Sequence, residues 1–314
     1  MERIQKLLLL LLAFLIVLSV VVWGLVLFPS AQDLFFKNSS SFSVVVLPDI
    51  QNYSQKGNEE ILFSQVNWIV ANKDKKNIVF VIFEGDLVNK WNDGGQWGDA
   101  NKAVSILESA GVAFELTLGN HDHNSNKPSL NAPLFEEYFP EGRFKDNAWW
   151  GGSFERYNSY QVLKVSGKDF LFLGLDFCPS KEEVEWADKI FSENAGKQLV
   201  LTTHGYLGLD ANRKVHNCGS TEYIWEMAKK HSNLRIILSG HVHGEALLVS
   251  KNDFGKEVYQ MLADYQDYSD GGGGYLRVLD FFPSEGKLRV STYSPFLNNF
   301  DIDSSSSFEF EYFN

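Results

Sequence analysis

The sequence of 314 residues is poor in basic side chains and contains no long basic run. It has 28 lysines and arginines against 40 aspartates and glutamates, so its formal net charge is −12. Because affinity for nucleic acid depends on basic side chains that neutralise phosphates, we expect no nucleic-acid partner. Internal repeats are also absent, and apolar residues make up 44% of the chain, which is ample for one large core or two small ones.

Cysteine is equally scarce, because Cys178 and Cys218 are the only two in the chain. Each follows a predicted strand, and the two loops should open on the same edge of one sheet. A bridge between them would brace the segment after His204. Two cysteines do not establish a disulfide, however, and two unpaired thiols are the alternative.

One long apolar run is present, LLLLLLAFLIVLSVVVWGLVLF at residues 7–28. It carries no charge and is long enough to cross a bilayer. Arg3 and Lys6 precede it, which favours an N-terminus inside the cytoplasm and the bulk of the chain outside. The expected organisation is a cytoplasmic N-terminus at 1–6, a transmembrane anchor at 7–28, a linker at 29–41 and one domain at 42–314.

The alternative to an anchor is a cleaved signal peptide, which would release a secreted protein. The apolar run is too long for a typical signal core. Pro29 also stands where cleavage before Gln32 would need a small residue. We therefore favour the uncleaved anchor.

The domain begins with alternating strands and helices and ends with strands and turns, which predicts an α/β fold. Strands are expected at 42–47, 78–83, 113–118, 170–175, 198–203 and 235–238. Helices are expected from Asn58 to about 72, around 100–109, from a capping box at Ser180 to about 194, and from about 221 to 231.

Five of these strands are followed at once by Asp, Asn or His. In an open α/β sheet the carboxyl ends of the strands form the ligand site, so these side chains should converge. Asp and Asn are also ordinary turn residues, but histidine is not, and four of the seven histidines stand at these strand ends. The residues are Asp49 with Gln51, then Asp86, then Asn120, His121 and Asp122, then His204, and finally His241 and His243.

Oxygen and nitrogen ligands of this kind suit divalent metal ions, and the absence of thiolates argues against a structural zinc site. The donors exceed what one tetrahedral ion needs, so we expect two ions that share a carboxylate and a water. Asp49, Asp86 and a hydroxide would cancel three of the four positive charges. The remaining charge would attract a phosphate.

The ordered motifs PDIQ, GDLVN, GNHD, THGY and SGHVHG resemble those of the calcineurin-like metallophosphoesterase superfamily, from Phe42 to Ser294. The resemblance implies a four-layer α/β/β/α sandwich in which two sheets pack face to face. It implies that Asp86 bridges the ions and that His121, beside Asp122, acts on the leaving oxygen. Further implied ligands are Asp49 and His243 for the first ion, and Asn120, His204 and His241 for the second.

The first motif departs from the usual Asp-x-His, because Gln51 stands in the histidine position. An amide oxygen is a weaker ligand than imidazole for zinc or iron, so ligation by Gln51 is open. A branch of the superfamily carries Asp-x-Gln, and the segments YQDY, GGGGYLRVLDF and YSPF resemble that branch.

The resulting expectation is a dimetal phosphoester hydrolase that acts outside the cytoplasm through a metal-bridging hydroxide, with phosphomonoesters favoured over phosphodiesters. A surface binding protein that retains the fold without catalysis is a third interpretation. The ions could be manganese, iron, zinc, nickel or cobalt. Tyr53, Asn89, Tyr206, Tyr265 and Gln266 are candidates for the substrate pocket, whereas His123, His216 and His231 are expected at the surface or in loops.

Overall fold

The computed structural model describes residues 41–124, 131–155, 157–215 and 218–313. The chain divides into two units, 1–40 and 41–314, and all of the described helices and strands belong to the second unit. The predicted membrane anchor and almost all of the linker lie outside the described residues. Among the residues that are described, no helix is long and apolar enough to cross a membrane.

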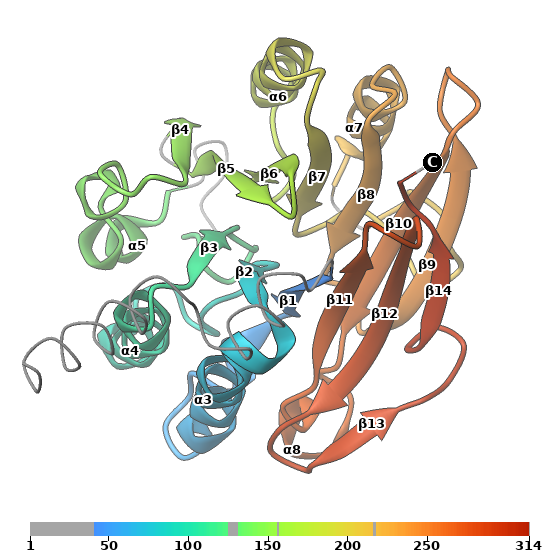
Figure 1. The fold of residues 1–314 in the computed structure, drawn as a ribbon. Coiled ribbons are helices and arrows are strands. Elements are labelled where there is room, and N and C mark those ends of the chain that lie inside the picture. Colours follow the sequence, from blue (N-terminus) through green and yellow to red (C-terminus); the bar gives the residue numbers. More distant parts are fainter. Residues whose placement is uncertain (1–40, 125–130, 156, 216–217, 314) are drawn as a thin grey trace, which may run out of the picture. The chain divides into compact units, whose positions relative to one another are not determined.

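The first sheet combines parallel strands from the start of the domain with antiparallel strands from its end (Figure 1). Its strand order is β13-β12-β11-β1-β2-β3, with β14 paired to β12. β1, β2 and β3 are parallel, whereas β11 runs antiparallel to β1. The strands are β1 (Phe42–Leu47), β2 (Ile78–Phe83), β3 (Ala113–Leu116), β11 (Leu276–Phe282), β12 (Lys287–Ser294), β13 (Asn299–Asp301) and β14 (Phe308–Glu311).

The second sheet has the order β4-β5-β6-β7-β8-β10-β9, and its strands β6, β7, β8 and β10 are parallel. Parallel neighbours present their carboxyl ends at one edge of a sheet. The strands are β4 (Trp150–Phe154), β5 (Asn158–Val165), β6 (Lys168–Leu175), β7 (Gln198–Thr203), β8 (Leu234–Ser239), β9 (Gly244–Lys251) and β10 (Glu257–Asp264).

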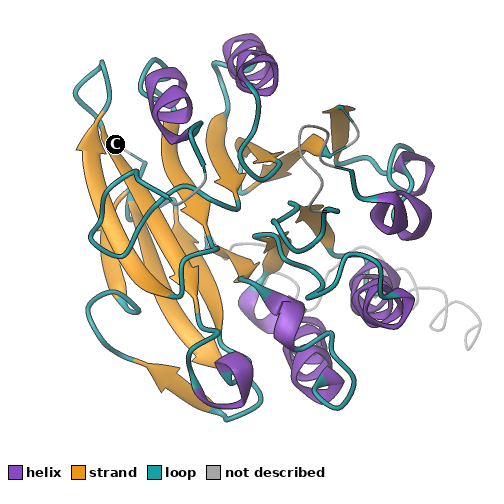
Figure 2. Ribbon diagram, turned by 180° about the vertical axis from the view of Figure 1, so that it is seen from behind, coloured by secondary structure: helices purple, strands orange, loops and turns teal. Residues whose placement is uncertain are grey.

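The helices cover the outer faces of the two sheets, as the view from behind also shows (Figure 2). One apolar cluster joins the first sheet to α3, α4 and α5, and another joins the second sheet to α6 and α7. A third cluster, including Val44, Phe80 and Phe172, lies between the sheets. The helical segments are η1 (Ile50–Asn52), α3 (Glu59–Lys76), α4 (Gly94–Ser109), α5 (Pro133–Tyr138), η2 (Glu141–Arg143), α6 (Lys181–Glu193), α7 (Thr221–Ala228) and α8 (Ser269–Gly272).

The two sheets and their helices confirm the mixed α/β architecture. β1, β2 and β7 have the bounds that the sequence predicts, and Ser180 forms the expected capping box with Glu183. α4 instead begins at Gly94, several residues early, because Asp93 accepts hydrogen bonds from the amides of Gly95 and Gln96. Glycine has a low helix propensity, so the glycines at the start of α4 make the sequence a poor predictor of this helix start.

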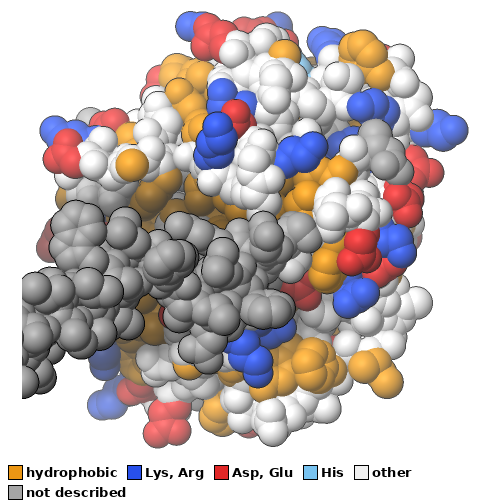
Figure 3. All heavy atoms as spheres, viewed as in Figure 1, with side chains coloured by type: hydrophobic (Ala, Val, Ile, Leu, Met, Phe, Trp, Pro, Cys, Tyr) orange, Lys and Arg blue, Asp and Glu red, His pale blue; other side chains and the backbone are white. Residues whose placement is uncertain are grey.

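Acidic and basic side chains are interspersed on the described part of the face in Figure 3. Neither sign dominates that part of the surface. The excess of acidic residues is therefore not gathered into one patch on this view.

A disulfide joins Cys178 to Cys218, with their Cα atoms 5.2 Å apart. β6 and β7 are parallel neighbours, so the loops that follow them open on the same edge, as the sequence predicts. The disulfide alternative is thus confirmed over two unpaired thiols.

We expect the double substitution of Cys178 and Cys218 by serine to lower the free energy of unfolding by about 4 kcal/mol, because the open chain gains loop entropy. Urea denaturation of the domain 42–314 measures this difference. The unaltered domain in reducing buffer should show the same loss. Equal midpoints for the oxidised and substituted proteins would contradict the prediction.

Candidate metal centre

Three buried side chains from three strand ends form the centre of the site. Asp49 follows β1, Asp86 follows β2 and His204 follows β7, so both sheets contribute. Each offers a ligand atom, and these atoms lie within 4.8 Å of one another. The strand ends therefore converge, as the sequence predicts.

Glycines permit this convergence at two places. A Cβ atom on Gly240 would lie 1.9 Å from Oδ2 of Asp49, and one on Gly119 would lie 2.1 Å from Oδ1 of Asp86. Any side chain there would displace a carboxylate. The glycines of GNHD and SGHVHG are thus required by the close approach of two other loops.

A hydrogen bond at Nδ1 sets the orientation of the His204 ring. Its Nδ1 donates to the main-chain oxygen of Glu84 at 2.9 Å, which turns Nε2 toward the other ligand candidates. Nε2 lies 3.4 Å from Oδ2 of Asp86 and 3.1 Å from Oδ1 of Asn120. A histidine held at one nitrogen by a carbonyl group is the usual arrangement of a metal ligand.

His241 completes a second group of donor atoms around Asn120. Its Nδ1 lies 2.7 Å from Oδ1 of Asn120, which also faces His204. Burial and the neighbouring His204 lower the pKa of His241 to about 4. The ring is therefore neutral at pH 7 and has a lone pair available for a metal.

The charges of the centre fit a cation. Burial, followed by the charge of Asp264, raises the pKa of Asp49 well above its usual range. Burial disfavours the charged ring of His204, yet Asp86 and Asp49 outweigh it and raise the pKa of His204 to about 10. Carboxylate groups that lie this close together repel one another when they are charged. Divalent ions bound between them would offset that repulsion.

In an extended chain, side chains two residues apart point the same way, but His241 and His243 do not follow this rule. The backbone of His241 is left-handed (φ 74°), so the segment is not extended. His243 is 46% exposed, and its Nδ1 lies 2.8 Å from Oδ1 of Asp267. Its Nε2 faces inward toward Asp264 at 3.9 Å.

Gln51 is buried beside Asp86. Its Nε2 donates to Oδ2 of Asp86 at 2.8 Å, and its Oε1 has no partner among the described residues. The oxygen and nitrogen of an amide group are assigned from their hydrogen-bond partners. The amide of Gln51 can therefore also be turned over, which would direct its oxygen to a bound cation.

We expect Gln51→His to tighten zinc binding at the first ion, because imidazole is a stronger zinc ligand than an amide oxygen. Competition with a chromophoric chelator measures the affinity. Gln51→Leu, which has a similar volume and no donor atoms, is the control. Unchanged affinity in Gln51→His would mean that this side chain does not reach the metal.

His121 and Asp122 have separate environments. His121 is exposed, its amide donates to Oδ1 of Asp86, and its Nδ1 donates to the main-chain oxygen of Asn89 at 3.0 Å. Asp122 is fully buried and accepts from the amides of Leu87, Val88 and Gly119, so it holds the loops after β2 and β3 together.

Three of the pocket candidates belong to the interior. The hydroxyl of Tyr206 donates to Gln260, that of Tyr265 to Glu245, and that of Tyr53 accepts from the amide of Gly274. All three tyrosines are at most 2% exposed, which corrects the expectation that they line a pocket. Of the other candidates, half-buried Asn89 contacts His121, and half-buried Gln266 donates to Asp264.

Two features of the site and its surroundings are not predicted by the sequence. Asp264 ends β10, which lies parallel to β8, but the strand falls in a segment that otherwise reads as antiparallel. Burial raises the pKa of Asp264 to about 6. His123 and His231 lie in loops, in line with the expectation of surface or loop positions, but they are only 1% and 8% exposed, and His216 lies outside the described residues.

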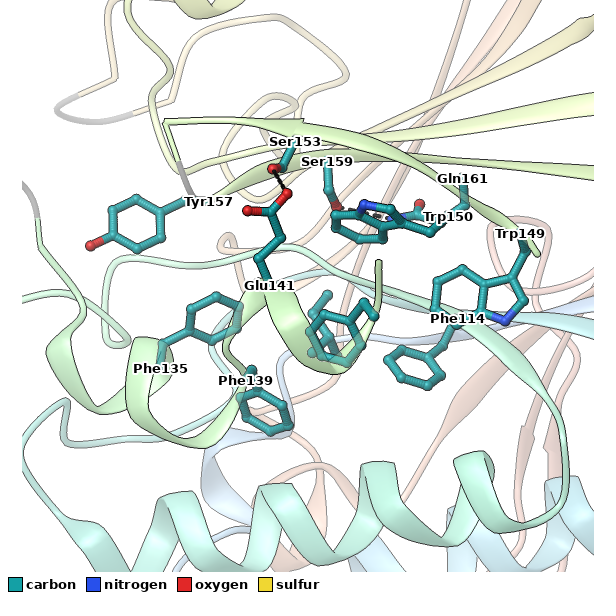
Figure 4. A pocket seen from close by; sticks show the side chains of 12 residues that line it. Phe114, Phe135, Phe139, Glu141, Trp149, Trp150, Ser153, Tyr157, Ser159 and Gln161 are labelled. Atoms are coloured by element: carbon teal, nitrogen blue, oxygen red, sulfur yellow. Dashed lines mark hydrogen bonds between the residues drawn. The ribbon is translucent and has the colours of Figure 1, made fainter. Parts of the chain in front are cut away.

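A cavity of about 420 Å³, including its open mouth, lies apart from this cluster (Figure 4). Aromatic rings from β3, α5 and the start of β4 line it, with Glu141 and Ser153 at one side. None of the metal-ligand candidates is among its lining residues.

The fold and this cluster define a metal-dependent phosphoesterase. A family model described as calcineurin-like phosphoesterase matches residues 42–245. The chain therefore belongs to the calcineurin-like phosphoesterase family. Asp49, Asp86 and His204 are its candidate metal-binding cluster.

Two curated proteins are similar in sequence. The chain is 30% identical over 285 residues to the uncharacterized protein YvnB of Bacillus subtilis, which covers 88% of this chain and 21% of YvnB. It therefore spans about a fifth of that relative. It is 22% identical over 219 residues to a probable cyclic nucleotide phosphodiesterase of Moraxella catarrhalis, covering 66% of this chain and 73% of the relative.

Two solved structures share the fold. A dimetal phosphatase from Danio rerio has a TM-score of 0.57 at 11% identity and covers 86% of this chain and 99% of its own. A purple acid phosphatase from yellow lupin has a TM-score of 0.57 at 15% identity and covers 87% of this chain and 54% of its own. At these identities the likeness concerns the fold alone.

Proposed function

We propose that this chain is a phosphomonoesterase in which Asp86 is shared by two metal ions. Asp49 and His243 would hold the first ion, and Asn120, His204 and His241 the second. The observation that carries the assignment is the meeting of Nε2 of His204 and Nδ1 of His241 on Oδ1 of Asn120, at 3.1 and 2.7 Å.

Two bound divalent ions would neutralise the phosphate and lower the pKa of the water that attacks it. The chain's own residues orient the reaction around them. His121 faces outward with Nδ1 held by Asn89, so Nε2 can give a proton to the leaving oxygen. Its amide, bound to Asp86, keeps that ring beside the metal centre.

A preference for monoesters is supported by Phe177. Its ring packs against His241 at 5.0 Å and against His204 at 5.7 Å, measured between ring centroids. We infer that this ring forms a wall on the side of the second ion, which would leave less room for the second substituent of a diester. The disulfide at Cys178 holds the wall in place.

Phosphodiesterase activity is the second candidate, because the similar Moraxella catarrhalis protein is named a probable cyclic nucleotide phosphodiesterase. Asn89 and Gln266 are only half buried and could contact a larger substrate. The wall formed by Phe177 favours the monoester.

The test is hydrolysis by the domain 42–314 after chelation and reloading with manganese, cobalt or nickel. We expect no activity without metal, restored activity with it, and a higher kcat/KM for p-nitrophenyl phosphate than for the bis-p-nitrophenyl ester or a cyclic nucleotide. Full activity in a metal-free sample would reject the mechanism. A preference for either diester would reverse the assignment of substrate.

We also propose that residues 7–28 anchor the enzyme in a membrane with its active domain outside the cytoplasm. The uncharged run, the preceding Arg3 and Lys6, and a disulfide that suits an oxidising compartment support this. Protease added to intact cells should digest the domain while the full chain stays in the membrane fraction. Release of a shortened chain into the medium would favour the cleaved signal.

A further inference from the structure

A buried histidine–aspartate pair lies outside the proposed ligand set. Nε2 of His123 donates to Oδ1 of Asp176 at 2.7 Å, and the two residues are only 1% and 4% exposed. His123 lies in the loop after β3, three residues beyond Asn120, whereas Asp176 directly follows β6. The hydrogen bond thus joins the two sheets at the edge that carries the metal centre.

Asp176 is held on several sides. Its Oδ1 also accepts from the amide of Phe177 at 2.7 Å, and its own amide donates to Oδ1 of Asn158 at 2.9 Å. Its main-chain oxygen accepts from the hydroxyl of Thr203 at 3.2 Å. Since Thr203 precedes His204, the position of Asp176 is set relative to that histidine.

The neighbour of Asp176 reaches the remaining histidine. The ring of Phe177 contacts both His204 and His241, and Cys178 fixes the same segment through its disulfide. Asp176 is therefore linked to all three proposed ligands of the second ion. Asn120 lies three residues before its partner His123, and Thr203, which it also contacts, precedes His204. The ring of the adjacent Phe177 contacts His241.

Stability alone explains the pair poorly. Burying two ionisable side chains costs a desolvation energy that the hydrogen bond between them offsets only in part. Nδ1 of His123 is buried as well and has no partner among the described residues, which adds to the cost. Groups that cost stability in this way are typical of functional sites.

We propose that His123 and Asp176 are positioning residues for the second metal ion, which keep Asn120 at the distance from His204 and His241 that the ion requires. The inference rests on the proposed ligand assignment. It predicts that breaking the pair weakens the second ion specifically, whereas a purely structural pair would affect both ions or neither.

The test uses His123→Phe, which keeps a ring against Tyr157 but removes the donor, and His123→Gln, which keeps a donor near the position of Nε2. The matched control is His231→Phe. His231 is also buried, and its Nε2 lies 2.7 Å from Oδ1 of Asp188, between α6 and the end of α7.

Calorimetric titration of the metal-free domain with manganese or zinc measures the two binding steps. Asn120→Ala identifies the step of the second ion, and His243→Ala that of the first. We expect His123→Phe to weaken the second step by ~10–100-fold and leave the first unchanged, as loss of a partner behind a metal ligand commonly does. His123→Gln should recover most of the affinity.

Unchanged binding of both ions in His123→Phe, or an equal loss at both, would overturn the inference. So would an effect of His231→Phe on the second step, because that variant should lower only the melting temperature. If the unaltered domain binds a single ion, the ligand assignment itself fails, and the inference with it. Melting temperatures of all variants identify any that does not fold.

Discussion

Replacement of Asp86 with alanine is expected to remove both metal binding and catalysis. Its Oδ2 lies 3.4 Å from His204 and its Oδ1 accepts from the amide of His121, so it stands between the ligand groups and the proposed acid. Loss of a shared carboxylate should cost more than the ~10²–10³-fold in kcat that removal of one stabilising donor costs.

Elemental analysis and steady-state hydrolysis of Asp86→Ala measure the two effects. Asp188→Ala is the matched control, because Asp188 also faces a histidine but lies on α6, away from the strand ends. The control should bind two ions and retain its activity. Two bound ions in Asp86→Ala would show that this carboxylate is not a shared ligand.

Replacement of His121 with alanine should separate catalysis from metal binding. We expect kcat to fall by ~10²–10⁴-fold, the usual contribution of a general acid, while both ions stay bound. The reason is geometric, because Nδ1 is occupied by Asn89 and the exposed ring leaves Nε2 for the leaving oxygen.

The leaving group provides the sharper measurement. A proton donated by His121 matters little for p-nitrophenol, which leaves readily as an anion, and matters most for an alkyl alcohol. The loss in His121→Ala should therefore be larger for an alkyl phosphate than for p-nitrophenyl phosphate. An equal loss for both substrates would assign His121 a role other than proton donation, and loss of an ion would make it a ligand.

The sequence predicts the strands at 42–47, 78–83 and 198–203, the candidate ligands at strand ends and the class of chemistry. The order of the strands within each sheet comes only from the structure. The reason that the sequence predicts the strands and the candidate ligands is local. Short apolar runs such as Phe42–Leu47 are bounded by Asp, Asn, Gly or His, and parallel strands must place those residues at one edge. The two sheets and the cluster of Asp49, Asp86 and His204 follow that logic.

Features that depend on contacts between distant segments cannot be predicted from the local sequence. Tyr53, Tyr206 and Tyr265 read as loop residues, but each hydroxyl finds a buried partner. His123 resembles any loop histidine until β6 brings Asp176 to its Nε2.

The two histidines of SGHVHG illustrate the same limit. Their spacing predicts a common direction only for an extended chain, whereas the positive φ of His241 turns them apart. That φ accompanies the hydrogen bond from the amide of His241 to Asp49, which lies almost two hundred residues earlier. Burial and backbone conformation at such positions depend on residues that approach from another sheet. The local sequence therefore does not predict them.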